Sequence, residues 1–203
     1  MAQPQRTTTV RHALHHDLAG AADVLAQAFV ADPWFRWLYP DDATWTQQAT
    51  AWFHFVLDRA FSKGHTYVAD GGAVNWIPPD VHFPEPDDVA LAVGLLGTQI
   101  GDRAATAFDT IGRAGATFPD RPRFHCVYVG VRPDAQGRGL GSTLLRRVLD
   151  ACDRDGLAAS LTSTNDANLP LYRSLGFREI GEVPIPGTGR SMRPMWREPL
   201  PLT

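Results

Sequence analysis

The feature that most constrains the fold is a glycine-rich segment, residues 131–142, which reads Val-Arg-Pro-Asp-Ala-Gln-Gly-Arg-Gly-Leu-Gly-Ser. It follows a strongly β-prone run, Phe124 to Val131, and precedes an amphipathic helix predicted from Leu140 to Asp153. The first amides of such a helix have no partner within it and lie at the positive end of the helix dipole. This strand-to-helix turn therefore predicts a binding site for phosphate groups.

Two common phosphate-binding motifs do not describe this turn. No Gly-Lys-Ser/Thr closes it, which excludes a Walker A loop, and Gly137, Gly139 and Gly141 are spaced two apart, unlike G-x-G-x-x-G. A flexible turn capped by glycine is the plain alternative, but three glycines at one strand–helix junction favour the phosphate site. Between Arg132 and Arg147 there are four arginines and one acid, so the segment carries a local charge of +3.

The rest of the chain indicates one α/β domain over residues 1–203, with no repeat, linker or low-complexity tract. Asp17 is expected to cap the first helix, and residues 31–42, with two prolines and four aromatics, to be loop or broken helix. We expect helices over 17–29, 43–62, 86–97, 102–116, 140–153 and 168–175. We expect strands over 7–13, 65–69, 73–77, 124–131, 157–162, 177–183 and 191–196.

Composition and spacing argue against several classes of protein. A net charge of −3 and a pI near 6.1 do not suggest a general nucleic-acid binder. The longest apolar run, around 89–96, is too short to span a bilayer, and the N-terminal segment lacks a signal-peptide core. Cys126 and Cys152 are expected to pack as small hydrophobes in a reducing cytoplasm. The histidines lack metal-ligand spacing, so we expect no metal, and no Ser-His-Asp or cysteine nucleophile stands out.

Two motifs together resemble signatures of the GNAT superfamily of N-acetyltransferases. Gln136, Gly139 and Gly141 fill the fixed positions of its acyl-CoA pyrophosphate motif, Q/R-x-x-G-x-G/A. The segment from Asn168 to Phe177 resembles its second signature, a helix that ends in Y-x-x-x-G-F. Residues 22–29, 68–73 and 183–192, together with Trp76, resemble the puromycin N-acetyltransferase branch. This similarity spans most of the chain and is loosest over 31–62 and 80–121, where an amine would be selected.

This resemblance implies an α+β fold with a mixed, mostly antiparallel sheet of about six to seven strands flanked by helices. The sheet would be splayed between the strands at 124–131 and 157–162. It also implies acetyl-CoA as co-substrate and direct attack on the thioester by a small-molecule amine, without an acyl-enzyme. The expected cofactor-binding residues are Val129, Gly130, Val131, Gln136, Gly137, Arg138, Gly139, Leu140, Gly141, Ser142 and Asn168.

The resemblance also implies two catalytic residues. Tyr172 is the candidate acid for the leaving thiolate. Proton transfer from a phenol with a pKa near ~10 to a thiolate with a pKa near ~8.5 is unfavourable. We therefore expect Tyr172 mainly to donate a hydrogen bond to the sulfur. Its alternative role is a half-buried packing aromatic. His125 is the candidate base; on an alternating strand it would share a face with Val127 and Val129. A structural histidine bonded to a neighbouring carbonyl, with a water chain as base, is the equal alternative.

The remaining predictions concern binding. Asn168 either bonds the cofactor arm or caps the helix that follows it. Trp34, Phe35, Trp37 and Tyr39 are candidate contacts for an apolar or aromatic amine, although aromatics more often form core. Alternative functions are acetylation of a peptide or protein N-terminus and acyl-CoA sensing without catalysis. We expect a cytoplasmic monomer or homodimer that binds neither nucleic acid nor membrane.

Overall fold

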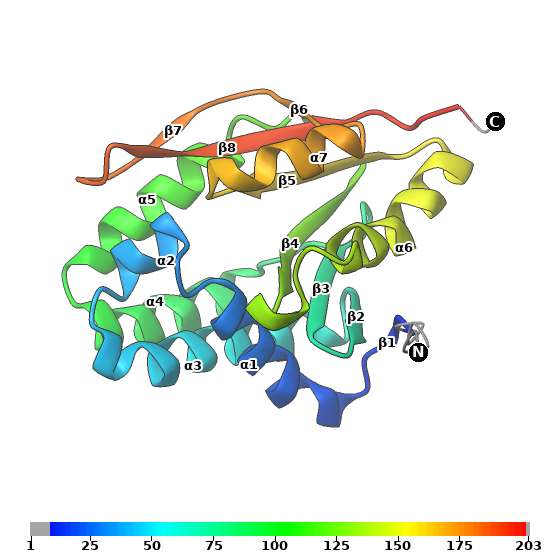
Figure 1. Cartoon of the computed structure of the whole chain (residues 1–203). Helices are drawn as coiled ribbons and strands as arrows, with labels where there is room; N and C mark the ends of the chain where they lie inside the picture. Colours follow the sequence, from blue (N-terminus) through cyan, green and yellow to red (C-terminus); the bar gives the residue numbers. More distant parts are fainter. Residues whose placement is uncertain (1–8, 202–203) are drawn as a thin grey trace, which may run out of the picture.

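A twisted sheet of eight strands organises the molecule in the computed structural model, which describes residues 9–201 (Figure 1). The strand order is β1-β2-β3-β4-β5-β8-β6, with β7 paired to β8. Within the described residues β4 and β5 form the one parallel pair, so the expected mixed, mostly antiparallel α+β sheet is confirmed. The strands are β1 (Arg11–His12), β2 (His65–Ala69), β3 (Gly72–Ile77), β4 (Arg123–Val131), β5 (Ala158–Ser163), β6 (Arg178–Glu179), β7 (Val183–Ile185) and β8 (Arg190–Arg197).

Helices cover both faces of this sheet. Helices α1 and α3 contact β3 on one face, while α6 contacts β3 and β4 on the other (Figure 1). None of the described helices is long and apolar enough to cross a membrane. The helices are α1 (Leu18–Ala28), α2 (Pro33–Leu38), α3 (Asp42–Phe61), α4 (Pro86–Ile100), α5 (Arg103–Gly115), α6 (Leu140–Asp155) and α7 (Leu169–Ser174).

Each face of the sheet has its own hydrophobic cluster. The first cluster contains Leu25 of α1 and Phe53 of α3 and extends to the α4–α5 hairpin. The second contains the apolar stripe of α6, including Leu144 and Leu145, both fully buried, together with Tyr172 of α7. Burying an amphipathic helix on each face is the main source of stability for a layered fold of this kind.

The sheet opens in its middle. Strand β4 pairs with β5 only over residues 123–126, opposite 158–161, while it continues to pair with β3 as far as Val131. The second half of β4 therefore has one edge without a strand partner. Figure 1 shows β4 and β5 diverging from this short ladder toward α6 and α7. This is the predicted splay, in the predicted place.

A bulge at Val127 reverses the side-chain alternation of β4. Asn75 of β3 lies opposite Tyr128, but the next residue, Trp76, lies opposite Cys126, so Val127 has no partner of its own. As a result Val127 and Tyr128 both pack into the first cluster, whereas Val129 packs into the second. The prediction that Val127 and Val129 share one face is therefore wrong, because a bulge interrupts the period of two.

Several boundaries differ from those predicted. The segment at 31–42 contains a short helix, α2, which begins at Pro33. Asp17 makes no side-chain cap on α1; its carboxylate binds Arg11 and the Leu14 amide instead. Within the described part of the first strand, only 11–12 pair, and positions 7–8 of that prediction lie outside the described residues. The single strand expected at 177–183 is divided into β6 and β7, which accounts for the eighth strand.

Candidate active site

The glycine-rich turn forms a cradle of free backbone amides at the start of α6. Gly137 and Gly139 have φ angles of 76° and 79°, in the left-handed region where glycine is favoured. The Thr143 amide donates to the Gly139 carbonyl at 3.1 Å and makes the first helical hydrogen bond. The amides of Leu140, Gly141 and Ser142 precede it and have no acceptor within the helix. They lie at the positive end of the helix dipole, where phosphate oxygens bind well.

The cradle opens into a cavity of about 520 Å³, here called the cradle cavity. The Gln136 side chain reaches back to donate to the Val131 carbonyl at 2.9 Å, which fixes the turn against the end of β4. Arg138 is exposed and does not line the cavity. Ten of the eleven predicted cofactor-binding residues do line it: Val129, Gly130, Val131, Gln136, Gly137, Gly139, Leu140, Gly141, Ser142 and Asn168.

The positive charge counted along residues 132–147 is not concentrated at the cradle. Arg132 pairs with Asp134 at 3.2 Å, and Arg147 lies over the Tyr67 ring on the sheet side of α6. Because none of the four arginines lines the cradle cavity, backbone amides and the helix dipole are the main attraction for phosphate there.

A second cavity of about 210 Å³, here called the inner cavity, lies beyond the splay. It is enclosed by α2, α5, β4, β5 and Met192 of β8. Four residues line both cavities, namely Phe29, Val129, Asn168 and Tyr172. The two cavities therefore meet where β4 and β5 separate, and a molecule held in one can react with a molecule held in the other.

Tyr172 lies where the cavities meet. Its side chain is 6% exposed and its ring packs edge-on against Phe177, with 6.3 Å between centroids. Its hydroxyl takes part in none of the hydrogen bonds formed within residues 9–201, although it borders both cavities. Burial raises the pKa of this phenol, and the nearby Cys126 and Asp32 raise it further. A neutral phenol is thus available as a hydrogen-bond donor throughout the physiological pH range.

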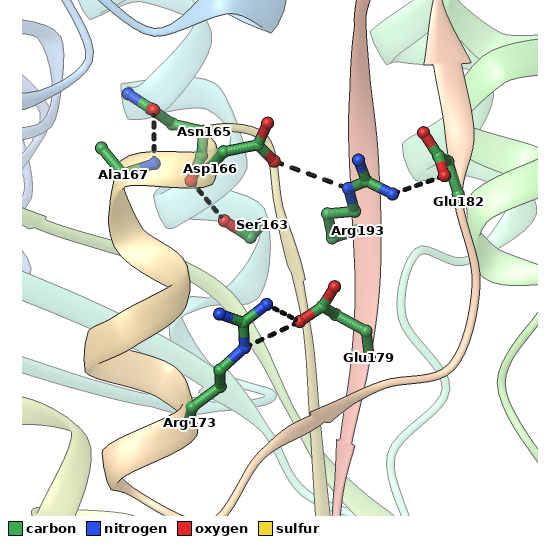
Figure 2. Close-up of polar contacts among 8 residues, drawn as sticks. All are labelled: Ser163, Asn165, Asp166, Ala167, Arg173, Glu179, Glu182 and Arg193. Carbon is green, nitrogen blue, oxygen red and sulfur yellow. Dashed lines mark hydrogen bonds and ion pairs between the residues drawn. The ribbon is translucent and has the colours of Figure 1, made fainter.

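Polar contacts fix the ends of the segment that carries Asn168 and Tyr172. Figure 2 shows Arg173 donating to Glu179 at 2.6 Å and Arg193 of β8 lying between Asp166 and Glu182. The Asn165 side chain caps the turn before α7 by accepting from the Ala167 amide at 3.0 Å (Figure 2). The segment is therefore held to the β8 side of the sheet.

Asn168 makes no side-chain cap on α7. Capping in this stretch is done by Asn165, three residues earlier. The Asn168 side chain instead lines both cavities. Of the two predicted roles, the structure leaves the amide free for a ligand and does not use it as a helix cap.

His125 is half-buried on β4 and lines the inner cavity. Its Nδ1 lies 2.9 Å from the Ser160 hydroxyl oxygen, which also accepts from Arg123 Nε at 3.1 Å. Burial lowers the pKa of His125 to about 4, and the positive charge of Arg123 lowers it further. The imidazole is therefore neutral at physiological pH, and its partner is a serine hydroxyl where a carbonyl was the expected alternative.

The low pKa of His125 predicts how the stability of the folded protein depends on pH. Its pKa is about 4 in the folded protein against 6.5 for a free side chain, so only the unfolded state takes up this proton between those values. The contribution of His125 to the free energy of unfolding should therefore fall by about 3 kcal/mol as the pH drops from about 6.5 to 4. Urea unfolding at pH 7.5, 5.5 and 4.5 measures the slope. His125→Gln should have a shallower slope, and equal slopes for both proteins would contradict this account.

The four predicted aromatic contacts fall into two pairs. Trp34 and Phe35 are buried and line the inner cavity. Trp37 and Tyr39 do not line it; Trp37 packs under Arg103, and the Tyr39 hydroxyl donates to Gln99 at 2.7 Å. The short helix α2 causes the division, because its turn sends positions 34 and 35 inward and positions 37 and 39 toward the α4–α5 hairpin.

Asp32 is a site residue that the sequence prediction missed. It is 4% exposed and lines the cradle cavity. One carboxylate oxygen accepts from the Trp34 and Phe35 amides, and the other accepts from the Thr164 hydroxyl at 2.6 Å. The last bond joins the α1–α2 connection to the end of β5. The Asp-Pro pair at 32–33 was the available signal, since aspartate at a cap before proline starts many helices.

Family comparison relates part of the chain to known proteins. Residues 84–177 match the family described as Acetyltransferase (GNAT) family. Over this stretch, which is a little under half of the chain, the protein is similar to the GNAT superfamily. A solved structure from Corynebacterium glutamicum, titled histone acetyltransferase HPA2 and related acetyltransferase, superposes with a TM-score of 0.72 at 25% identity over 97% of this chain and 98% of that one.

Two curated relatives of this protein match over a shorter stretch. The N-alpha-acetyltransferase RimI of Mycobacterium tuberculosis is 42% identical over 35% of this chain and 44% of its own length. The L-amino acid N-acyltransferase MnaT of Escherichia coli is 43% identical over 32% of this chain and 38% of its own length. The matches thus span less than half of each relative. None of these comparisons points to the puromycin branch specifically.

No metal site accompanies the two cavities in the described residues. Residues 9–201 contain no group of three or more His, Cys, Asp or Glu side chains arranged to hold a metal ion. Cys126 lines the inner cavity and Cys152 lies on the buried face of α6, and burial raises the pKa of both thiols. Both cysteines are free and buried, as expected for packing residues.

Proposed function

We propose that this protein is an acetyl-CoA-dependent N-acetyltransferase that acts on a small amine. The observation that carries the proposal is the junction of two cavities at Tyr172, one lined by a phosphate-binding cradle and the other by apolar side chains. Acetyl-CoA supplies a thioester: the amine nitrogen forms a bond to the acetyl carbon, the carbon–sulfur bond breaks, and the amine loses a proton while the thiolate gains one.

The cradle cavity suits the shape of the cofactor. The amides of residues 140–142 would bind the pyrophosphate, and the unpaired edge of β4 at Val129 to Val131 would bond the amide groups of the pantetheine arm, in place of the missing strand. Asn168 would bond the same arm from the α7 side, because its amide is not used for capping.

Tyr172 would act on the leaving sulfur as a hydrogen-bond donor. Because burial raises its pKa, complete proton transfer to a thiolate near ~8.5 is still more uphill than for a free phenol. A hydrogen bond that strengthens as negative charge develops on sulfur stabilises the transition state without that transfer.

His125 would accept a hydrogen bond from the attacking amine. Its pKa of about 4 makes it too weak a base to deprotonate an ammonium near ~8 at equilibrium, a step that is uphill by about 5 kcal/mol. The amine must therefore enter neutral, and the apolar cavity favours the neutral form by desolvation. As the nitrogen attacks, it becomes cationic and acidic, and His125 or a water then takes its proton.

The test is thiol release from acetyl-CoA with a panel of amines, measured beside acetyl-CoA binding by calorimetry. We expect micromolar-range binding and amine-dependent release of CoA, with the acetylated amine confirmed by mass spectrometry. Binding without turnover on any amine would favour an acyl-CoA sensor. Turnover on peptides alone would favour an N-terminal acetyltransferase.

A further inference from the structure

The walls of the inner cavity hold no charged side chain. None of its lining residues is Asp, Glu, Lys or Arg. Aromatic and aliphatic side chains dominate, including Phe29, Trp34, Phe35, Ile111 and Phe118. The one basic group on the wall, His125, is neutral because of its burial. A ligand anion in this cavity would therefore have no cationic partner on the walls.

Nearby arginines are already engaged elsewhere. Arg123, whose charge acts on His125, donates from Nε to Ser160 and from Nη1 to the Pro119 carbonyl, and its guanidinium lies over the Phe118 ring. Arg193, next to Met192 on β8, pairs with Asp166 and Glu182 (Figure 2). Neither guanidinium lines the cavity, so a carboxylate placed there would lose its water without gaining an ion pair, which is strongly unfavourable.

A buried carboxylate lies beside the junction of the cavities. Asp32 lines the cradle cavity, and its carboxylate accepts a hydrogen bond from the hydroxyl of Thr164, which lines the inner cavity. Burial raises the pKa of Asp32, while hydrogen bonds from Thr164 and from the Phe35 and Trp34 amides favour its ionised form. An ionised Asp32 repels a ligand carboxylate but not the neutral amine that enters for reaction.

The size of the cavity limits the rest of the acceptor. A cavity of about 150 Å³ lined by apolar residues holds benzene, so one of 210 Å³ accommodates an aromatic ring with a short carbon arm. Such a body would pack against Phe35, Ile111 and Phe118 while its amine reaches toward Tyr172.

We propose that the acceptor is a small monoamine with an aromatic or apolar body and no carboxylate beside its amine. This inference rests on the proposed function for its chemistry, and it excludes free amino acids as good acceptors. The relative from Escherichia coli is named for L-amino acids, so the proposal separates this chain from that relative.

The test uses amines that differ only in the carboxylate. Phenethylamine is compared with L-phenylalanine, and tryptamine with L-tryptophan, by kcat/KM for acetyl transfer per unprotonated amine. We expect the carboxylate-free partner to be favoured by about a hundredfold in each pair. Phenylalaninamide, which keeps the bulk but removes the charge, should lie within about tenfold of phenethylamine. Equal rates for phenylalanine and phenethylamine would overturn the proposal, as would a phenylalanyl peptide that is turned over faster than either amine.

A variant that places a positive charge on the wall of the inner cavity tests the same proposal independently. Ile111 lies on α5, lines the inner cavity and is 40% exposed, so a longer side chain fits there without crowding the core. Ile111→Arg should raise the rate with phenylalanine relative to phenethylamine by at least about tenfold. Ile111→Gln, which adds a polar group without charge, is the matched control and should leave the ratio near the wild-type value. Equal ratios in the two variants would contradict the proposal.

Binding measurements separate this proposal from the proposed function. Calorimetry of each amine pair with the CoA-bound protein reads selectivity without any chemistry. If phenethylamine binds and phenylalanine does not, the proposal stands even where no acetyl transfer occurs, and only the catalytic function fails. If transfer occurs but both bind alike, the function stands and the proposal on acceptor class fails.

Discussion

Replacing Ser142 with aspartate is expected to abolish useful affinity for acetyl-CoA without destabilising the protein. Ser142 is the third residue of α6 and lines the cradle cavity. A carboxylate there faces the pyrophosphate at short range, and the repulsion amounts to about 3 kcal/mol, or roughly a hundredfold in Kd. The same carboxylate in the first turn of a helix is favourable to folding by about 0.5 kcal/mol. Calorimetric titration and thermal melting measure the two effects on one sample.

Ser142→Asn is the matched control for this variant. Asparagine has the size of aspartate without its charge, so its Kd should stay within about fivefold of wild type. Raising the salt concentration should reduce the difference in Kd for acetyl-CoA between the two variants, because salt screens the repulsion between exposed charges. Equal affinities for Ser142→Asp and Ser142→Asn would show that phosphate does not bind at this turn.

Replacing Tyr172 with phenylalanine is expected to lower kcat by about 10²- to 10³-fold, the usual loss when one donor to a developing charge is removed. The ring keeps its packing against Phe177, so acetyl-CoA affinity and the thermal midpoint should change little. Single-turnover acetyl transfer under saturating acetyl-CoA isolates the chemical step. Because the pKa of Tyr172 is raised, the wild-type rate should not decline below pH 10 through ionisation of this phenol.

Tyr67→Phe provides the control for Tyr172→Phe. Tyr67 is equally buried but lies under Arg147 on β2, away from both cavities. The Tyr67→Phe substitution should leave kcat within about twofold of the wild-type value. A kcat for Tyr172→Phe within tenfold of wild type would mean that this hydroxyl takes no part in the chemistry and that Tyr172 is a packing residue.

Features specified by neighbouring residues were predictable from the sequence. The glycines of the cradle and the helix that precedes Gly176 are local patterns, and they predicted the fold class and the cofactor-facing turn. The bulge at Val127 was not predictable, because a strand with uniform β propensity gives no sign of where an extra residue is inserted. That one residue moves Val129 to the opposite face from Val127.

The inner cavity was beyond prediction for a different reason. Its walls come from Trp34, Ile111, Val127 and Thr164, which lie in four separate segments. Each segment looks like ordinary core or loop on its own, and only tertiary packing brings them together. The pKa of His125 has the same origin, because burial and the position of Arg123 set it. The predicted roles of the site residues stay predictions until the variants are measured.

The narrow overlap between the two cavities has a consequence for how this family diversifies. Only Phe29, Val129, Asn168 and Tyr172 line both of them. Trp34, Phe35 and Met192, which shape the inner cavity alone, lie outside the stretch that matches the family, residues 84–177. Mutations there can accumulate without disturbing the cradle or the phenol. A lineage can thus exchange one acceptor for another while inheriting its cofactor chemistry unchanged.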